Sequence, residues 1–412
     1  MSGSALIVGG GAAGMFCAVC LARGGVECTV LEKNSSTGKK MMITGKGRCN
    51  VTNNCDADTV IKNIPRNPKF MYSALYNFSP KDTMKFFEDL GVELKTERGG
   101  RVFPVSDKAA TVVNALQHEM KRLGVRVLKE NVKDIVLKDG TKIVVTDKDT
   151  HFAKNVVIAT GGKSYPATGS TGDGYVLAQK LGHTVTDVAP ALVPLITKGS
   201  EAAQMMGLSL KNVTLSLTDI KKNKTLYKEM GEMLFTHFGI SGPLTLSASS
   251  HIQTMEKDRY CADIDLKPAL SKEQLDARIL RDFSQEKNRD IANSLGRLLP
   301  SSMIPVIIKR SGIPPETKVN SVTKEQRARL VDLLKCFRLY IDGFRPIEEA
   351  IITRGGVNVK EIDPKTTQSR LCKGVYFIGE VLDVDAYTGG FNLQTAFSTA
   401  YACAESIKNN GG

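Results

Sequence analysis

A glycine-rich turn near the start of the chain has the spacing of a dinucleotide-binding site. Gly9-x-Gly11-x-x-Gly14 comes at the end of the apolar segment 4–9, and a helix is expected directly after it. In such a turn the first glycine permits the tight bend, the second admits a pyrophosphate, and the third lets helix and strand pack closely. Glu32 ends the next apolar segment, where a carboxylate can accept hydrogen bonds from ribose hydroxyls. This motif leaves NAD and FAD open.

The C-terminal part of the chain favours FAD. Residues 374–380 are an expected buried strand ending in glycine and acid, Asp383 follows in a polar loop, and residues 388–394 open a new apolar helix. The N-terminus of this helix can direct backbone N–H groups at the electron-rich pyrimidine edge of a flavin, while a carboxylate holds the ribityl hydroxyls. NAD would need no second clamp of this kind.

A third glycine segment lies between these two. Residues 155–162 form an expected strand that runs into two glycines, so the backbone can approach a cofactor there. Before it, residues 132–137 and 142–146 alternate as the strands of a hairpin with its turn at Asp139-Gly140. Such an antiparallel crossover commonly decorates a flavin-type Rossmann domain, and Val132 would contact the adenine through its backbone.

The middle of the chain changes its periodicity twice. Period-two alternation indicates strands from about residue 194 to 266, and residues 271–338 change to helical spacing with charged faces, interrupted by prolines. No second Gly-x-Gly-x-x-Gly occurs in this region, so no dedicated nicotinamide domain is expected. NADH or NADPH would then have to visit the flavin transiently as the electron donor.

Length and composition exclude several classes of protein. The chain has 412 residues, 42% hydrophobic and 24% charged, which predicts two to three globular domains rather than a disordered chain. No segment is long and apolar enough to cross a membrane, and the N-terminus lacks the features of a signal peptide, so a cytoplasmic protein without membrane contact is expected. The five histidines and nine cysteines show no close ligand spacing, so no metal is predicted.

The net charge of +13 biases the surface toward polyanions such as nucleic acid or anionic substrates. Residues 196–345 carry 24 basic and 17 acidic side chains, so the middle of the chain is disproportionately basic. Charge by itself does not identify a partner, and the oligomeric state stays open.

Several segments together resemble the YhiN/BaiN-type flavoproteins over nearly the whole chain. They are Gly9–Gly14, Gly38–Lys40, Thr44–Asn53, Ala159–Gly162 and Gly379–Gln394. The Gly-Arg-Cys-Asn-x-Thr-Asn sequence within Thr44–Asn53 is much more specific than the glycine turn, and Thr44 stands where Ser is common.

The resemblance implies an α/β fold with one FAD. A Rossmann-type, glutathione-reductase-like FAD-binding domain would comprise residues 1–193 and 340–412, with an inserted β-barrel-like domain at 194–268 and a small helical domain at 269–339. Its expected FAD contacts are Gly9, Gly11, Ala12, Ala13, Gly14, Glu32, Lys33, Lys40, Gly45, Gly47, Arg48, Asn50, Thr52, Val132, Ala159, Thr160, Gly161, Gly162, Gly379, Glu380, Asp383, Gly389, Gly390, Asn392, Leu393 and Gln394.

Three side chains are candidate proton donors for a flavin reaction. Cys49 lies beside Arg48, and a neighbouring cation favours a thiolate. His237 lies in a glycine-punctuated loop of the inserted region, and Tyr387 precedes the Thr-Gly-Gly clamp. Buried packing for the cysteine and a structural loop role for the histidine are the alternatives.

Members of the resembled family reduce a uridine of large-subunit ribosomal RNA to dihydrouridine, reduce unsaturated steroid-acid intermediates, or oxidise small amines such as aminoacetone. The basic insert favours ribosomal RNA as the partner, because phosphate contacts supply affinity that is independent of sequence. The alternatives are a small-molecule ene-reductase or amine oxidase, and a non-catalytic flavoprotein that binds RNA.

Overall fold

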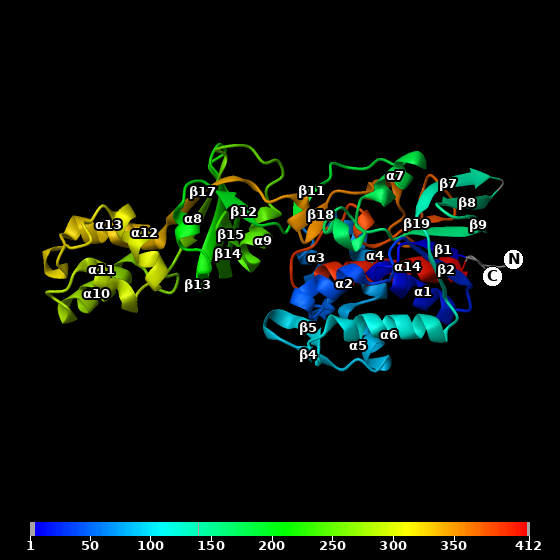
Figure 1. Cartoon of the computed structure of the whole chain (residues 1–412), viewed down its shortest axis with the longest axis horizontal. Helices are drawn as coiled ribbons and strands as arrows, with labels where there is room; N and C mark the ends of the chain where they lie inside the picture. The colour runs from blue at the N-terminus through cyan, green and yellow to red at the C-terminus, as the bar shows by residue number, and fades with distance from the viewer. Residues whose placement is uncertain (1–4, 139, 410–412) are drawn as a thin grey trace. The chain divides into compact units, whose positions relative to one another are not determined.

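The protein divides into two compact units, which are described separately. The computed structural model describes residues 5–138 and 140–409. One unit combines Met1–Ala191 with Ile347–Gly412, and the other, the inserted unit, is Leu192–Pro346 (Figure 1). The described parts of the chain before residue 192 and after residue 346 therefore belong to the same unit, as expected for a nucleotide-binding domain that carries an insertion.

The first unit is built on a parallel five-stranded sheet of the Rossmann type. Its strand order is β19-β10-β1-β2-β6. The strands are β1 (Ala5–Val8), β2 (Cys28–Glu32), β6 (Arg126–Lys129), β10 (Asn155–Ile158) and β19 (Val375–Phe377). The apolar segments at 4–9, 27–32 and 374–380 thus contain β1, β2 and β19 of this sheet, with β10 between β1 and β19. Residue 4 lies outside the described residues. The predicted Rossmann-type fold is confirmed.

Each face of this sheet has its own hydrophobic core, because alternate side chains of a strand point to opposite faces. Ile7, Val30 and Val157 pack with the helices of one face, and Val8, Leu31 and Ile158 belong to the core of the other face. The helices of the first face are α1 (Ala12–Arg23), α6 (Ala109–Arg122) and α14 (Phe391–Asn409). On the second face lie α3 (Ala57–Lys62), α4 (Tyr72–Asn77) and α7 (Asp173–Lys180).

Short elements complete the first unit. The hairpin of β7 (Val132–Lys138) and β8 (Thr141–Thr146) forms as predicted and continues to β9 (Thr150–Ala153), while Asp139 of its turn lies outside the described residues. The remaining elements are α2 (Lys39–Ile43), β3 (Thr52–Asn53), α5 (Pro80–Asp89), β4 (Leu94–Thr96), β5 (Arg101–Pro104), β11 (Ala189–Ala191) and β18 (Ile352–Arg354). Strands β3, β5 and β4 form a small sheet, and β11 pairs with β18.

The inserted unit contains a closed six-stranded barrel, which confirms the predicted barrel-like insertion. Its order is β12-β15-β14-β13-β16-β17. The strands are β12 (Leu195–Thr197), β13 (Ser209–Asp219), β14 (Lys224–Thr236), β15 (Gly239–Ser241), β16 (Tyr260–Asp265) and β17 (Phe337–Phe344). The predicted boundary between the helical domain and the FAD-binding domain, at 339/340, falls inside β17. This strand follows the helices in sequence and belongs to the barrel.

Helices complete the inserted unit. They are α8 (Glu201–Gln204), α9 (Pro243–Ser249), α10 (Lys272–Gln285), α11 (Ile291–Ser294), α12 (Ile304–Ser311) and α13 (Lys324–Lys335). Capping boxes begin α10 at Ser271 and α13 at Thr323. One hydrophobic cluster extends from barrel residues such as Leu215 to helix residues such as Ile279 and Leu330. The separate helical domain at 269–339 stays a prediction.

Candidate functional site

The glycine turn after β1 is shaped by close backbone contacts. Gly9 has φ +105°, and a Cβ there would lie 2.6 Å from the carbonyl oxygen of Ala159. A Cβ on Gly14 would lie 1.9 Å from the carbonyl oxygen of Gly9, whereas a Cβ on Gly11 would meet nothing within 4 Å. The first and last glycines are thus required by the protein itself, and the side of Gly11 faces open space.

That open space is a cavity of about 1340 Å³, part of it open to solvent. The predicted FAD contacts that line it are Gly9, Gly11, Ala12, Ala13, Glu32, Lys33, Lys40, Val132, Ala159, Thr160, Gly161, Glu380, Asn392 and Leu393. The Oγ1 of Thr160 is buried without a hydrogen-bond partner among the described residues. A glycine turn and a helix N-terminus on one large cavity fit a dinucleotide such as FAD.

Both carboxylate oxygens of Glu32 accept hydrogen bonds from the protein. Oε2 accepts a hydrogen bond from the backbone N–H of Gly10 at 2.8 Å. Oε1 accepts from the backbone N–H and the side-chain amide of Asn34 at 2.8 and 2.7 Å. The carboxylate is therefore oriented at the end of β2 before any ribose arrives, as a ribose acceptor requires.

Lys33 and Asn34, which follow Glu32, bind the segment 168–173 beside the cavity. The Lys33 ammonium contacts Asp173 Oδ2 at 2.5 Å and also the hydroxyl of Thr171. The Asn34 amide donates to the carbonyl of Thr168 at 3.1 Å. Both contacts join the end of β2 to the segment 168–173, part of which lines the cavity. Lys33 is thus engaged with the protein, and its predicted contact with FAD stays a prediction.

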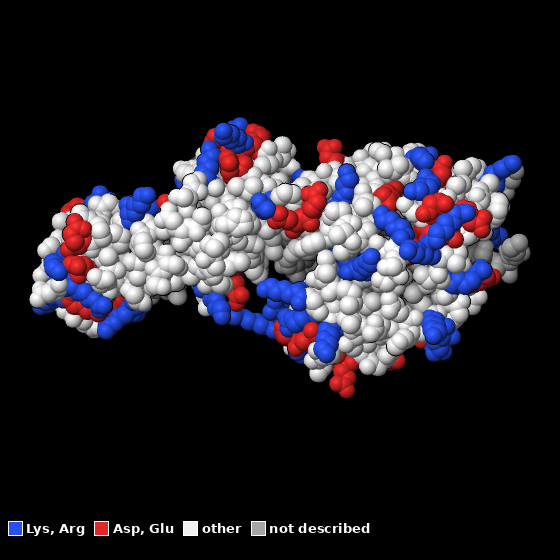
Figure 2. Space-filling view, viewed as in Figure 1, with Lys and Arg blue, Asp and Glu red and all other residues white. Residues whose placement is uncertain are grey.

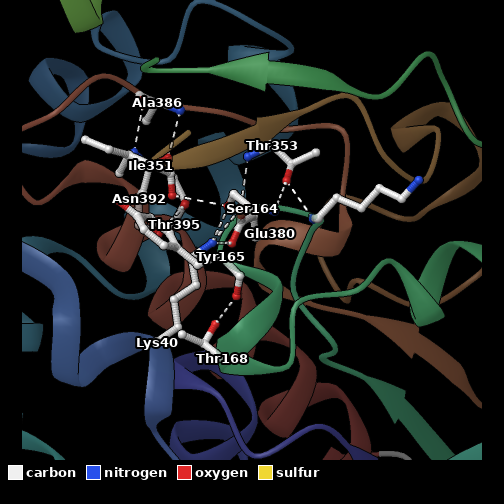
Figure 3. A network of polar contacts seen from close by, with 11 residues as sticks. Lys40, Ser164, Tyr165, Thr168, Ile351, Thr353, Glu380, Ala386, Asn392 and Thr395 are labelled. Carbon is white, nitrogen blue, oxygen red and sulfur yellow. Dashed lines mark hydrogen bonds and ion pairs between the residues drawn. The ribbon is translucent and has the colours of Figure 1, made fainter. Parts of the chain in front are cut away.

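A polar network of the cavity wall joins segments far apart in sequence (Figure 3). Lys40 Nζ lies 2.7 Å from Glu380 Oε2 and 2.7 Å from Ser164 Oγ. The backbone N–H of Thr353 donates to Glu380 Oε1 at 3.0 Å, and the Thr353 hydroxyl accepts from the backbone N–H of Lys163 at 2.7 Å. Four separate segments are thereby held together by one ion pair and its hydrogen bonds.

The C-terminal clamp forms, with most of its polar groups engaged inside the protein. The Asn392 amide donates to the carbonyls of Ala386 and Tyr387 at 2.7 and 3.2 Å and accepts from the Ala386 N–H. Gln394 is fully buried and bonds to the hydroxyls of Thr52 and Thr83 at 2.6 and 2.8 Å. Asn392 therefore lines the cavity and also fixes the loop at Ala386 and Tyr387. Gln394 is not part of the cavity lining.

Asp383 also lies outside the cavity lining. Its carboxylate is paired with the guanidinium of Arg66, with Nη2 3.0 Å from Oδ2. Two residues further on, Asp385 is buried, and its Oδ1 has no hydrogen-bond partner among the described residues. Burial raises the pKa of Asp385 to about 6. The predicted ribityl contact of Asp383 stays a prediction.

The segment Thr44–Asn53 makes an unusual turn beside the cavity. Gly45, Lys46 and Gly47 have φ of 57°, 58° and 82°, and Cys49 has φ of 61°. The Arg48 guanidinium lies 4.0 Å from the ring centre of Phe103. Other predicted FAD contacts outside the lining, besides Asp383 and Gln394, are Gly14, Gly45, Gly47, Arg48, Asn50, Thr52, Gly162, Gly379, Gly389 and Gly390.

The expected thiolate at Cys49 is wrong. The Arg48 guanidinium pairs with Glu97 and Asp107, at 2.8 and 3.1 Å. Cys49 is fully buried in the hydrophobic core, and burial raises the pKa of its thiol to about 12. Because Glu97 and Asp107 already neutralise the charge of Arg48, its position next to Cys49 in the sequence does not stabilise a thiolate.

The other two candidate donors lie in different units. Tyr387 is half-buried, and its backbone N–H donates to the carbonyl of Asn63 at 2.9 Å. His237 is exposed in the turn between β14 and β15, with its ring centre 5.0 Å from that of Phe238. Neither residue is part of the cavity lining, nor is Cys49. The catalytic roles of all three stay predictions.

Several lining residues were not predicted as contacts. They are Glu130, Asn131, Thr168, Gly169, Ser170, Asp173, Ile351, Ile352 and Thr395, among others. Residues 168–174 are rich in glycine, which is a local signal for a close backbone approach, and Glu130 and Asn131 adjoin Val132. Ile351 and Ile352 carry no local signal in the sequence, and Ile352 is positioned by the pairing of β18 with β11.

Comparison with known proteins identifies relatives over the full chain. The family described as HI0933-like protein Rossmann domain matches residues 3–406. The chain is 32% identical over 402 residues to the 3-dehydro-bile acid delta(4,6)-reductase of Clostridium scindens, covering 96% of each chain. It is also 32% identical over 409 residues to the ribosomal RNA dihydrouridine synthase of Haemophilus influenzae, covering 98% of each.

A solved structure supports the fold. The 3-ketosteroid delta1-dehydrogenase of Sterolibacterium denitrificans aligns with a TM-score of 0.52 at 11% identity, covering 99% of this chain and 100% of that chain. At this identity the similarity concerns the fold alone. Within residues 5–138 and 140–409, no helix is both long and apolar enough to cross a membrane.

Proposed function

The chain belongs to the HI0933-like family of FAD-dependent oxidoreductases, and on that premise we propose that it reduces uridine in large-subunit ribosomal RNA to dihydrouridine. Relatives named ribosomal RNA dihydrouridine synthase, from Haemophilus influenzae and Escherichia coli, are 32% and 30% identical over 409 residues. The observation that carries the choice of RNA is the basic excess of residues 196–345, with 24 cations and 17 acids. A small steroid acid requires no such surplus.

We propose NADH or NADPH as the electron donor. Residues 192–346 contain no second Gly-x-Gly-x-x-Gly, which favours a donor that visits the flavin and leaves. When bound, FAD supplies the hydride for the reduction of a C=C bond. This chain would hold it through the backbone at Gly9–Ala13, the oriented carboxylate of Glu32, and the wall formed around Lys40 and Glu380.

The second carbon of the double bond must receive a proton from an acid. Tyr387 is our preferred donor, because it is half-buried on a loop whose carbonyls are fixed by Asn392 of the cavity lining. Cys49 would have to donate from a fully buried, neutral thiol. His237 belongs to the inserted unit, so it could donate this proton only if that unit brings it to the substrate. The target base would have to be unstacked before it can react.

The test is nucleoside mass spectrometry of ribosomal RNA from cells with and without the gene. We expect dihydrouridine to disappear on deletion and to return with the wild-type gene. Tyr387→Phe should restore less than Cys49→Ala, and the matched control Tyr340→Phe, on an exposed barrel tyrosine, should restore fully. Unchanged dihydrouridine in the deletion strain would reject the RNA substrate.

A small unsaturated molecule is the second candidate substrate. The Clostridium scindens relative, named as a bile acid reductase, is 32% identical to this chain, as is the dihydrouridine synthase of Haemophilus influenzae. Reduction of a free unsaturated steroid acid without RNA would favour this reading, and oxidation of aminoacetone would favour an amine oxidase. A flavin that no nicotinamide donor reduces would favour a non-catalytic RNA-binding flavoprotein.

A further inference from the structure

Net charge alone does not mark a binding surface on this protein. On the face drawn in Figure 2, Lys and Arg side chains are spread over both units, and many stand beside Asp or Glu. A phosphate-binding surface needs cations that acidic neighbours do not already neutralise. The relevant place is therefore one where cations clearly outnumber the acids within reach.

One end of the barrel in the inserted unit meets this condition. Strands β13 and β14 are its longest, with 11 and 13 residues, and residues 220–223 connect them in an exposed turn (Figure 1). The segment 256–259, which leads into β16, lies beside this turn, because Asp219 pairs with both Lys224 and Tyr260. The backbone N–H of Ile220 also donates to the carbonyl of Arg259 at 2.8 Å.

Arg259 fixes the two segments to each other. Its Nε and Nη2 lie 3.0 and 2.7 Å from Asp219 Oδ2, and its Nη1 contacts Glu256. The side chains of Arg259 and Asp219 are only 15% and 2% exposed. The backbone that carries the surrounding lysines is therefore held by a nearly buried ion pair.

The charges at this end do not balance. Six cations belong to it, Lys198, Lys221, Lys222, Lys224, Lys257 and Arg259, together with four acids, Asp219, Glu256, Asp258 and Asp342. Three of the acids are in ion pairs, Asp219 with Arg259, Glu256 with Lys221 and Arg259, and Asp258 with Lys198. Asp342 acts electrostatically on Lys198.

Three exposed lysines remain, Lys222, Lys224 and Lys257, which we call the lysine triplet. In the part of the chain that the structure describes, no ion pair involves them. Asp219 and Asp258 also interact electrostatically with Lys222 and Lys257, but each of these acids has its ion pair with another cation, so positive charge is left over at this end.

We propose that the lysine triplet binds the phosphate backbone of the ribosomal RNA substrate. This inference rests on the proposed function and names the surface through which the inserted unit holds its substrate. Ammonium groups on flexible stems suit a backbone of repeating phosphates, because they bind as point charges without demanding one geometry. Release of counterions from the RNA would supply an affinity that is independent of sequence.

The test compares two triple variants that lose the same charge. One is Lys222→Gln/Lys224→Gln/Lys257→Gln. The control is Lys287→Gln/Lys309→Gln/Lys324→Gln, which removes three exposed lysines from the helical part of the same unit. Binding to ribosomal RNA from the deletion strain is measured as a function of KCl concentration. We expect the slope of log K against log salt to be shallower by about 2 to 3 in the triplet variant.

The control variant should change that slope by less than about 1. Equal changes in both variants, or no change in the triplet variant, would overturn the proposal. A loss of binding to vesicles of anionic phospholipid, with RNA binding intact, would assign the triplet to a membrane surface instead. If the wild-type protein neither binds this RNA nor forms dihydrouridine, the proposed function itself fails, whatever the variants do.

Discussion

The cavity of the first unit and the hairpin end of the barrel treat charge in opposite ways. In the cavity wall, Lys40 and Glu380 neutralise each other at 2.7 Å, and hydrogen bonds from Ser164 and Thr353 fix the pair. At the hairpin end, formed by residues 220–223 and 256–259, Asp219, Glu256 and Asp258 are in ion pairs with other cations, and the lysine triplet is in none. A site for one molecule of fixed shape needs polar groups oriented in advance. A surface for a polyanion needs surplus charge and tolerates loose orientation.

The largest effect that sharpens this contrast concerns the glycine turn. Gly14→Ala should lower the free energy of unfolding by about 3 kcal/mol and abolish FAD retention, because its Cβ would lie 1.9 Å from the Gly9 carbonyl oxygen. Gly11→Ala, whose Cβ would meet no protein atom within 4 Å, should leave the stability of the FAD-free protein unchanged and weaken FAD binding about tenfold. Denaturant unfolding and flavin titration measure both. Equal loss of stability in both variants would refute this division of roles.

In the first unit Asp385, outside the cavity lining, is an exception because its buried Oδ1 has no hydrogen-bond partner among the described residues, and replacing it should stabilise the protein. Its folded-state pKa of about 6 lies above the ordinary value of 3.8, so the carboxyl group contributes stability below about pH 4 that is lost as the pH rises to 6. At pH 7, Asp385→Asn should raise the free energy of unfolding of the FAD-free protein by on the order of 2 kcal/mol. The gain should vanish below pH 4. An equal gain at pH 4 and pH 7 would exclude the carboxylate as its cause.

Cys49 allows a test at alkaline pH. Its folded-state pKa of about 12 lies above the ordinary 9.0, so its contribution to stability is complete below pH 9 and falls as the pH rises above it. Between pH 9 and 10.5 the wild type should lose up to about 1.4 kcal/mol per pH unit more than Cys49→Ala. The comparison of slopes removes the cost of the missing sulfur atom. Identical slopes would show that the thiol is already ionisable in the folded protein.

The smallest expected effect concerns the Lys40–Glu380 pair. A double-mutant cycle of Lys40→Met and Glu380→Gln should give a coupling energy of about 1 kcal/mol, because both side chains are 22% exposed and solvent screens their attraction. The exposed pair Lys85–Asp89, with side chains 72% and 53% exposed, is the matched control and should couple by less than about 0.5 kcal/mol. Equal coupling in the two pairs would mean that the cavity wall gains nothing from its partial burial.

Local patterns predicted the fold well and the contacts of the site unevenly. Apolar runs ending in glycine or acid identified β1, β2 and β19, because buried parallel strands have this composition wherever they occur. The same reasoning failed for Cys49, since the charge of Arg48 is neutralised by Glu97 and Asp107, about 50 and 60 positions further on. It also missed Ile351 and Ile352, which have no glycine or charge to distinguish them.

What the sequence by itself determined is the geometry that short stretches of backbone impose. Gly9, Gly11 and Gly14 span only six residues, so their spacing already required the turn and the start of α1. What only the tertiary structure decided is which charges meet. Glu380 reaches Lys40 across 340 positions, and Arg259 reaches Asp219 across 40. Electrostatic attraction acts over a few ångströms of space, and only the folded path of the chain sets those distances.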